Sequence, residues 1–213
     1  TVQELATRYG MPGTYYLNRS RDGFGPDYAR KLSSDGSSVG VHTLSHDYMP
    51  TLMPNTIHYE MLANRVERES ETDQPINSYA APFTSNQNKD IPNSLAYNTQ
   101  AILRAGLHNQ PLWTSDISFK NPHLASPADM TFAFETRPGD KDVDAAKYDK
   151  RIESLDKNYD ANTKLSHCMY IGIHVAYPDA KAWGDIEAVL KKYSNRPDWW
   201  YCNMTQYAAY ARQ

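Results

Sequence analysis

Three histidines combine a reactive side chain with a useful position in the sequence. His42 and His46 stand four residues apart, directly after the apolar run at 39–41. Four residues bring two side chains to one face of a helical turn, about 5–6 Å apart at Cβ, and two imidazoles placed in this way can share one metal ion. His174 lies near the end of the apolar run at 168–175. Functional groups gather at the carboxyl ends of parallel strands, so the pattern predicts a metal site at His42 and His46 and a catalytic role for His174.

Each of these histidines also has an ordinary structural interpretation. Two histidines in an HxxxH pair can be surface or capping residues, with Thr43 and Ser45 only starting a helix. A histidine on a buried strand, such as His174, can be a core residue whose ring nitrogens are hydrogen-bonded within the fold. The elements around the histidines have to separate these interpretations.

Short apolar strands alternate with amphipathic helices along the chain, which predicts an α/β fold with a parallel sheet or barrel. We expect strands at 14–17, 39–41, 79–83, 111–117, 168–175 and 199–202. We expect helices at 2–9, 28–32, 57–68, 94–105, 140–162, 183–193 and 205–212. In the helix at 57–68, Met61, Leu62 and Val66 are expected to face the core. The charged residues Glu60, Arg65, Glu67 and Glu69 are expected to lie elsewhere, on its outer face.

Length and composition exclude several classes of protein. The chain has 213 residues, which favours one large domain over two small ones. Hydrophobic residues make up 40% of the chain but form no long apolar run, so we expect no membrane span. A net charge of -3 without any basic block makes nucleic acid an unsuitable partner. Cys168 and Cys202 are either free or a single pair, and they cannot form a cysteine zinc site.

Four short motifs follow one another along the sequence. They are Tyr9–Leu17, Val39–His46, Ala81–Phe83 and Gly172–His174. In this order they resemble the polysaccharide deacetylases of carbohydrate esterase family 4, which have the NodB-homology fold, and the resemblance covers nearly the whole chain. The His-Thr-x-Ser-His element is its most specific part and is similar to the family motif whose histidines bind zinc or a related divalent ion. The resemblance therefore implies that His42 and His46 are metal ligands and that His174 is the general acid.

The first family motif is absent from this sequence. In the family it is a pair of aspartates on the strand before the first helix, one a general base and the other a metal ligand, and this sequence begins inside that helix. We expect Thr1 to be a truncation point and the natural polypeptide to carry an upstream strand with both carboxylates. Loss of a general base costs about 10²–10⁴ in rate, so residues 1–213 by themselves are expected to be inactive.

The third and fourth family motifs are only partly present. The arginine of the third motif is replaced by alanine, but Pro82 and Phe83 remain. The resemblance implies that both residues bind substrate, with the Phe83 N–H as a candidate oxyanion donor. In the region of the fourth motif, Trp113 is expected to line a sugar groove and Asp116 to orient His174. A solvated or helix-capping aspartate is an equally good interpretation of Asp116.

The resemblance implies both a fold and an activity. We expect a single domain over 1–213, a distorted (β/α) barrel of the polysaccharide-deacetylase type that is incomplete at its N-terminus. The expected reaction is metal-dependent hydrolysis of N- or O-acetyl groups on a polysaccharide or oligosaccharide, with zinc as the metal, in a protein exported to the periplasm or cell surface. The main alternative is a noncatalytic carbohydrate-binding relative, and a weaker one is an unrelated barrel with a fortuitous HxxxH pair.

Overall fold

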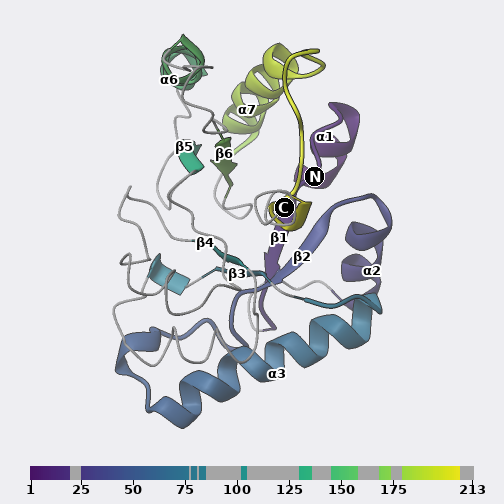
Figure 1. Cartoon of the computed structure of the whole chain (residues 1–213), viewed down its shortest axis with the longest axis vertical. Coiled ribbons are helices and arrows are strands. Elements are labelled where there is room, and N and C mark those ends of the chain that lie inside the picture. The colour runs from purple at the N-terminus through teal and green to yellow at the C-terminus, as the bar shows by residue number, and fades with distance from the viewer. Residues whose placement is uncertain are drawn as a thin grey trace. The chain divides into compact units, whose positions relative to one another are not determined.

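The computed structural model describes the parts of the chain that are drawn as coloured ribbons in Figure 1. They are residues 1–19, 25–76, 78–80, 82–84, 102–104, 130–135, 145–157, 168–173 and 179–206. The chain divides into two compact units, each made of two segments. Unit 1 consists of Thr1–Met11 with Ala128–Trp200, and unit 2 consists of Pro12–Pro127 with Tyr201–Gln213. Each unit contains its own sheet.

Among the described strands of unit 2, four form a parallel sheet in the order β1-β2-β3-β4. Thr14 pairs with Ser38 and Leu17 with Val41, so β1 and β2 are paired along their whole length. Because the strands are parallel, their carboxyl ends lie at one edge of the sheet. The elements are β1 (Thr14–Leu17), α2 (Pro26–Ser34), β2 (Ser38–Val41), η1 (Met49–Thr51), α3 (Pro54–Thr72), β3 (Ser78–Ala80), η2 (Pro82–Thr84) and β4 (Ile102–Arg104).

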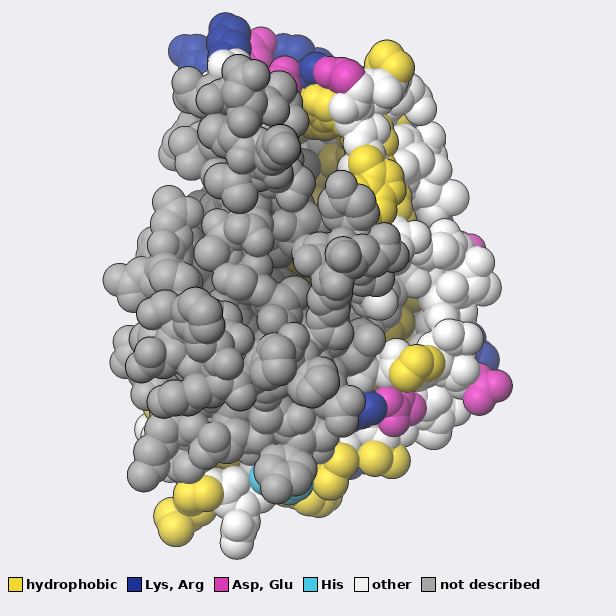
Figure 2. Space-filling view, viewed as in Figure 1, with side chains coloured by type: hydrophobic (Ala, Val, Ile, Leu, Met, Phe, Trp, Pro, Cys, Tyr) yellow, Lys and Arg dark blue, Asp and Glu magenta, His cyan; other side chains and the backbone are white. Residues whose placement is uncertain are grey.

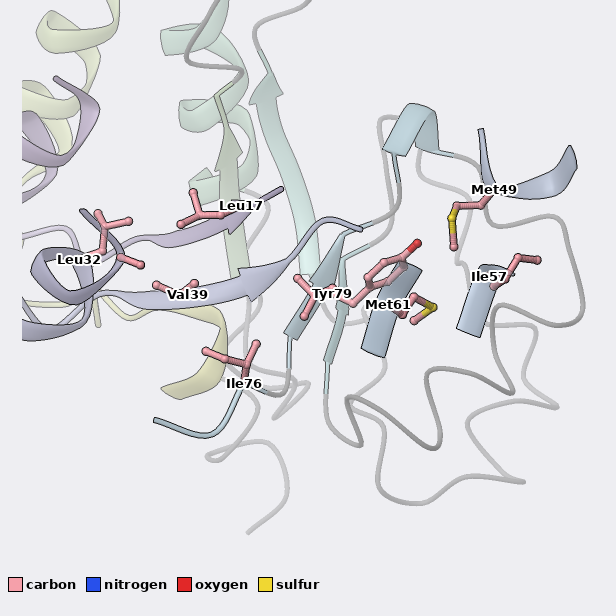
Figure 3. Close-up of a cluster of buried hydrophobic side chains, with 10 residues drawn as sticks. Leu17, Leu32, Val39, Met49, Ile57, Met61, Ile76 and Tyr79 are labelled. Carbon is pink, nitrogen blue, oxygen red and sulfur yellow. The ribbon is translucent and has the colours of Figure 1, made fainter. Parts of the chain in front are cut away.

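The core of unit 2 joins this sheet to helices α2 and α3 (Figure 3). Val39 and Val41 of β2 and Tyr79 of β3 are buried, and Leu32 of α2 and Met61 of α3 belong to the same apolar cluster. Val39 and Val41 are two residues apart, so their side chains leave the strand on the same face. The burial of this face fixes the position of α3 beside the carboxyl end of β2.

The Tyr16 ring lies over Gly40 and links the first three strands. A Cβ atom added to Gly40 would lie 2.5 Å from Tyr16 Cδ1, and the Tyr16 hydroxyl accepts a hydrogen bond of 2.7 Å from Ser78 Oγ. The side chain therefore extends from β1 across β2 to β3. Only glycine leaves room for this ring at the middle of β2.

The second segment of unit 2 is tethered at the amino ends of the strands. Asn203 Nδ2 donates to the Gly36 carbonyl at 3.1 Å, and the Met204 N–H donates to Thr14 Oγ1 at 2.8 Å. Thr14 begins β1 and Gly36 precedes β2. The tether and the residues that follow β2 thus lie at opposite edges of the sheet.

Unit 1 combines a pair of parallel strands with three described helices. Leu5 of α1 and Ala182, Ile186 and Leu190 of α7 form one buried cluster. Helix α7 begins at an ordinary cap, because Asp179 Oδ1 accepts a bond of 2.8 Å from the Ala182 N–H. The elements are α1 (Val2–Arg8), β5 (Met130–Glu135), α6 (Ala145–Lys157), β6 (Cys168–Gly172) and α7 (Ala180–Tyr193).

A charged cluster joins α6 to α7. Lys192 Nζ donates to both oxygens of Asp149, at 2.7 and 2.6 Å, and the Tyr193 hydroxyl donates to Asp149 Oδ1 at 2.5 Å. The hydrogen bond from Lys192 is the main cause of a lowered pKa at Asp149, and the bond from Tyr193 adds to it. The Asp149 carboxylate therefore stabilises the folded state in its ionised form.

The expected α/β architecture with parallel strands is confirmed, whereas two individual predictions are wrong. Residues 102–104 form strand β4, paired with β3, within the range expected to be a helix. Residues 199–203 are irregular and not a strand, because the Trp199 ring stacks on Tyr193, with centroids 5.7 Å apart, beneath the Arg196 guanidinium. Strand β5 was not expected at all.

Other predictions concern parts of the chain that the structure leaves undescribed. The strand expected at 111–117 lies outside the described residues. The described strands form sheets of four and two strands, so barrel closure and the single domain stay predictions. None of the helices in the described ranges is both long and apolar enough to cross a membrane.

Candidate functional site

His42 follows β2 directly, and both its backbone and its ring are fixed by neighbouring elements. Its backbone N–H donates to Asn64 Oδ1 of α3 at 3.1 Å, and its ring Nδ1 lies 2.8 Å from the Ala80 carbonyl oxygen at the end of β3. Because a carbonyl oxygen can only accept, Nδ1 carries the proton, and Nε2 holds the lone pair of the neutral ring. Metal-binding histidines are usually oriented by such a bond from the other ring nitrogen.

The His46 ring lies beside the His42 ring. The two centroids are 4.8 Å apart, and the ring planes meet at 73°. The helical turn expected to bring them together is wrong, because residues 42–48 are not helical. Thr43 and His46 instead have φ angles of 62° and 61°, and these two left-handed residues turn the chain back on itself. The two rings, four residues apart in sequence, therefore meet through a strained loop and not through a helical turn.

Backbone strain is concentrated around the histidine pair. Among the described residues other than glycine, five have positive φ, and three of them are Thr43, His46 and Phe83. Such a conformation costs about 1–3 kcal/mol and persists only where the surroundings hold it. Of the other two, Asp73 caps the end of α3 and Asn195 follows α7. Strained residues of this kind cluster at functional sites.

Pro82 and Phe83 bring the end of β3 to the histidines. Pro82 is buried and begins η2, and Phe83 has a φ of 52°. The Phe83 ring centroid lies 4.9 Å from that of His46 and 6.2 Å from that of Tyr48. Phe83 and Tyr48 remain 55% and 48% exposed, so they form an aromatic edge next to the histidine pair. An exposed aromatic face of this kind is suited to stacking on another ring.

Glu60 of α3 is a site residue that the sequence did not reveal. Its Oε2 atom accepts from the Leu44 N–H at 3.0 Å and from the Ser45 N–H at 2.8 Å, and its Oε1 atom accepts from Ser45 Oγ at 2.7 Å. The side chain is only 6% exposed. Its expected place on the outer face of the helix is therefore wrong. Burial, with Glu60 nearby, also raises the pKa of Tyr79, whose hydroxyl stays neutral.

Helix α3 presents a different face to the core from the one expected. Leu62 and Val66, expected to face the core, are 39% and 55% exposed, and hydrophobic side chains reach the surface where α3 lies (Figure 2). The reason is that the buried face carries polar residues whose hydrogen bonds hold residues 42–46, here called the histidine loop. A count of apolar residues does not reveal this role. The residues buried on α3 are Ile57, Glu60, Met61, Asn64, Arg68 and Thr72. Their helical spacing was the available signal.

The two histidines suit a divalent metal as part of its ligand set. Imidazole nitrogen is a common zinc ligand, and the His42 tautomer directs Nε2, not Nδ1, to the bonding role. Within the part of the chain that the structure describes, no group of three or more histidine, cysteine or acidic side chains surrounds one point. His42 and His46 could therefore supply two of the ligands that such a site needs.

Three sequence-predicted residues lie outside the described part of the chain. They are His174, expected to be the acid, Asp116, expected to orient it, and Trp113, expected to line a sugar groove. Their proposed roles stay predictions. The structure brings together His42, His46, Pro82 and Phe83 of the expected set, at the carboxyl ends of β2 and β3.

Solved structures similar to this chain show the fold. The peptidoglycan deacetylase PdaC from Bacillus subtilis is 12% identical, with a TM-score of 0.60 over 99% of this chain and 82% of that chain. The Xyl-CE4 domain of a multidomain xylanase from the hindgut metagenome of Trinervitermes trinervoides is 12% identical, with a TM-score of 0.56 over 96% and 80%. BA3943 from Bacillus anthracis, described as a CE4 family pseudoenzyme, is 13% identical, with a TM-score of 0.58 over 96% of this chain and 58% of that chain.

Sequence comparison gives one family and no individual relative. The chain spans less than two thirds of the BA3943 chain, and no curated protein matches it. The family model for polysaccharide deacetylase matches residues 2–102, which include both histidines, Pro82 and Phe83. The match covers just under half of the chain, and over residues 2–102 the chain is similar to the polysaccharide deacetylase family.

Proposed function

We propose that this protein hydrolyses acetyl groups on a carbohydrate, with a divalent metal held in part by His42 and His46. The observation that carries the proposal is the histidine pair itself. The two rings lie 4.8 Å apart, and the bond from His42 Nδ1 to the Ala80 carbonyl selects Nε2 for the metal. The match of residues 2–102 to the polysaccharide deacetylase family supports the acetyl group and the carbohydrate as the substrate class.

The chain's own residues have separate tasks in this proposal. A bound metal, zinc in the simplest case, supplies a Lewis acid that polarises the acetyl carbonyl. His42 and His46 donate nitrogen lone pairs, and the Phe83 N–H is the candidate donor to the developing oxyanion. His174 protonates the leaving amine or alcohol, and Asp116 orients it. The aromatic edge and Trp113 hold the sugar, and an exported location suits such a substrate.

The alternative is a noncatalytic carbohydrate-binding protein. One of the similar structures is described as a pseudoenzyme, so the fold occurs without activity. In that case the histidine pair and the aromatic edge would still bind a metal and a sugar, but no acetate would be released. The two proposals therefore differ in one measurable product.

The metal proposal is tested with zinc and two matched histidine variants. We expect zinc binding, measured by calorimetry on the 213-residue chain, to weaken about tenfold or more in His46→Asn, because one ligand is lost. Asparagine tolerates the left-handed backbone at this position better than most residues. His58→Asn, which changes a histidine of α3 outside the site, should bind zinc like the original chain. Equal affinity in all three proteins would exclude these ligands.

Acetate release then separates the enzyme from the binding protein. The zinc-loaded chain is incubated with N-acetylglucosamine oligomers and, separately, with O-acetylated xylan, and free acetate is measured. Release that disappears in His46→Asn and remains in His58→Asn supports the enzyme. Because residues 1–213 lack the aspartate pair of the family, release is expected to be about 10²–10⁴ slower than from a site with its general base, so the assay is run at high protein concentration against a zinc-only blank. Sugar binding with acetate release no faster than in that blank supports the noncatalytic relative.

A further inference from the structure

We propose that Glu60 is a positioning residue that holds His42 and His46 in metal-binding geometry, with Asn64 as its partner on the same helix. This inference rests on the proposed metal-dependent function and extends it to residues that are not themselves ligands. Neither side chain contributes an atom to the proposed ligand set. Both act on the backbone that carries the two imidazoles.

The Glu60 carboxylate is bonded at the middle of the histidine loop. It accepts from the two consecutive amides of Leu44 and Ser45, at 3.0 and 2.8 Å, and from the Ser45 hydroxyl at 2.7 Å. These two residues lie between the ligands, so any movement of their amides moves both rings. A buried carboxylate is stable only when such donors satisfy it, and hydrogen bonds to charged groups are the stronger kind.

Most backbone N–H groups of the loop are held by side chains, and the Leu44 carbonyl accepts a backbone bond of 3.0 Å from the Arg19 N–H. The His42 N–H donates to Asn64 Oδ1 at 3.1 Å, and the His46 N–H donates to Thr43 Oγ1 at 3.1 Å. Together with the two amides on Glu60, four of the five N–H groups from His42 to His46 have a side-chain acceptor. Loop shape therefore depends on α3, which supplies three of these four bonds.

The strain in the loop explains why it needs the hydrogen bonds to Glu60 and Asn64, here called the clamp. Thr43 and His46 both hold left-handed backbone, and each position costs about 1–3 kcal/mol unless its surroundings support it. Without the clamp, the loop would relax toward ordinary φ values, and the His46 ring would turn away from His42. The clamp is anchored on a helix of 19 residues, which is a rigid support.

A merely structural role for Glu60 predicts a different result from a positioning role. In the structural case, changing Glu60 lowers stability and leaves the metal affinity of the folded protein unchanged. In the positioning case, metal affinity falls beyond what an equal loss of stability explains. Glu69 provides the matched control, since it lies on the same helix and its Oε1 atom also accepts a backbone N–H, that of Ile76 at 3.0 Å.

The experiment compares Glu60→Gln with Glu69→Gln in the 213-residue chain. Zinc affinity is measured by calorimetry, and the melting temperature is measured without metal. We expect Glu60→Gln to bind zinc about 10–100-fold more weakly, which is the usual effect of changing a residue that orients a ligand. Glu69→Gln should stay within about twofold of the original affinity, because the Glu69 carboxylate bonds Arg65 Nε and the Ile76 N–H, away from the histidine loop.

Each outcome decides between the proposals. Unchanged zinc affinity in Glu60→Gln overturns the positioning role and leaves the metal site intact. Absence of zinc binding by the original chain overturns the metal site, and the positioning role with it. If Glu60→Gln does not fold, Ser45→Ala takes its place, because it removes one of the three bonds to Glu60. A zinc affinity of Ser45→Ala equal to that of the original chain then overturns the positioning role.

Discussion

A single backbone carbonyl determines the chemistry of His42. Ala80 lies at the end of β3, and its carbonyl oxygen takes the Nδ1 proton of a histidine that follows β2. The tautomer therefore depends on the pairing of two strands. A change that displaces β3 would alter the ring nitrogen offered to a metal, even with both histidines intact.

The Cys202 thiol provides a prediction at the same scale. It is a free thiol, and burial raises its pKa to about 11. Since the thiolate is the reacting form, we expect iodoacetamide to modify it slowly at pH 8 and about tenfold faster for each unit of pH up to about 10. The measurement uses a Cys168→Ser background, so that only one thiol is followed by mass spectrometry. Modification at pH 8 as fast as in urea would contradict this.

Residue types were sufficient to name four residues that the structure brings together. His42, His46, Pro82 and Phe83 could be named from spacing and motif, because their side chains carry the expected chemistry. Glu60 could not, because its role is to accept hydrogen bonds from backbone amides that sequence spacing does not display. Its surroundings exist only after α3 packs beside the loop.

At the scale of the elements, the sheet of unit 2 requires a glycine at its centre. An added Cβ at Gly40 would lie 2.5 Å from Tyr16 Cδ1 and 3.1 Å from the Ser78 carbonyl. We expect Gly40→Ala to lower the free energy of unfolding by about 1–3 kcal/mol, since the Tyr16 ring must move. Urea denaturation measures this change.

Gly184, inside helix α7, is the control for that experiment. An added Cβ there meets nothing within 4 Å, so Gly184→Ala should raise stability by up to about 1 kcal/mol through helix propensity alone. If Gly40→Ala is as stable as the original chain, the Tyr16 ring does not occupy the position described.

Elements with a local sequence pattern were predicted correctly. Elements whose conformation or orientation depends on a neighbouring element were not. Helices α1 and α7 and strands β1 and β2 follow from local periodicity and capping. Strand β4 was mistaken for a helix because its conformation comes from pairing with β3. The inward face of α3 was misassigned for a related reason, since polar residues of α3 are buried where they bond the histidine loop.

At the scale of the whole molecule, acid should weaken the fold partly through unit 1. The bonds from Lys192 and Tyr193 lower the pKa of Asp149 below its ordinary 3.8. A carboxyl group with a lowered pKa stabilises the folded state above its ordinary value, and this contribution is lost as pH falls through the lowered one. We therefore expect Asp149→Asn to lower the melting temperature near pH 6 and to change it little near pH 2.

The control for the acid experiment changes the weaker partner of the same lysine. Glu153 lies 3.2 Å from Lys192, and Glu153→Gln leaves the bonds to Asp149 in place. Its melting temperature should keep the original dependence on pH. A constant difference between Asp149→Asn and the original chain from pH 2 to 6 would show that the carboxylate charge is not involved.

The division of each unit into two segments has a consequence for biosynthesis. Unit 1 needs residues on both sides of Ala128, and unit 2 is completed only by the bonds of Asn203 and Met204 to the starts of β1 and β2. During translation, neither unit can acquire all of its contacts until the ribosome has passed about residue 200. The histidine loop and α3, which lie within residues 42–72, are made long before that point. The nascent chain thus carries its candidate site in a unit that still lacks its second segment, and contacts of such long sequence separation make the final step of folding slow.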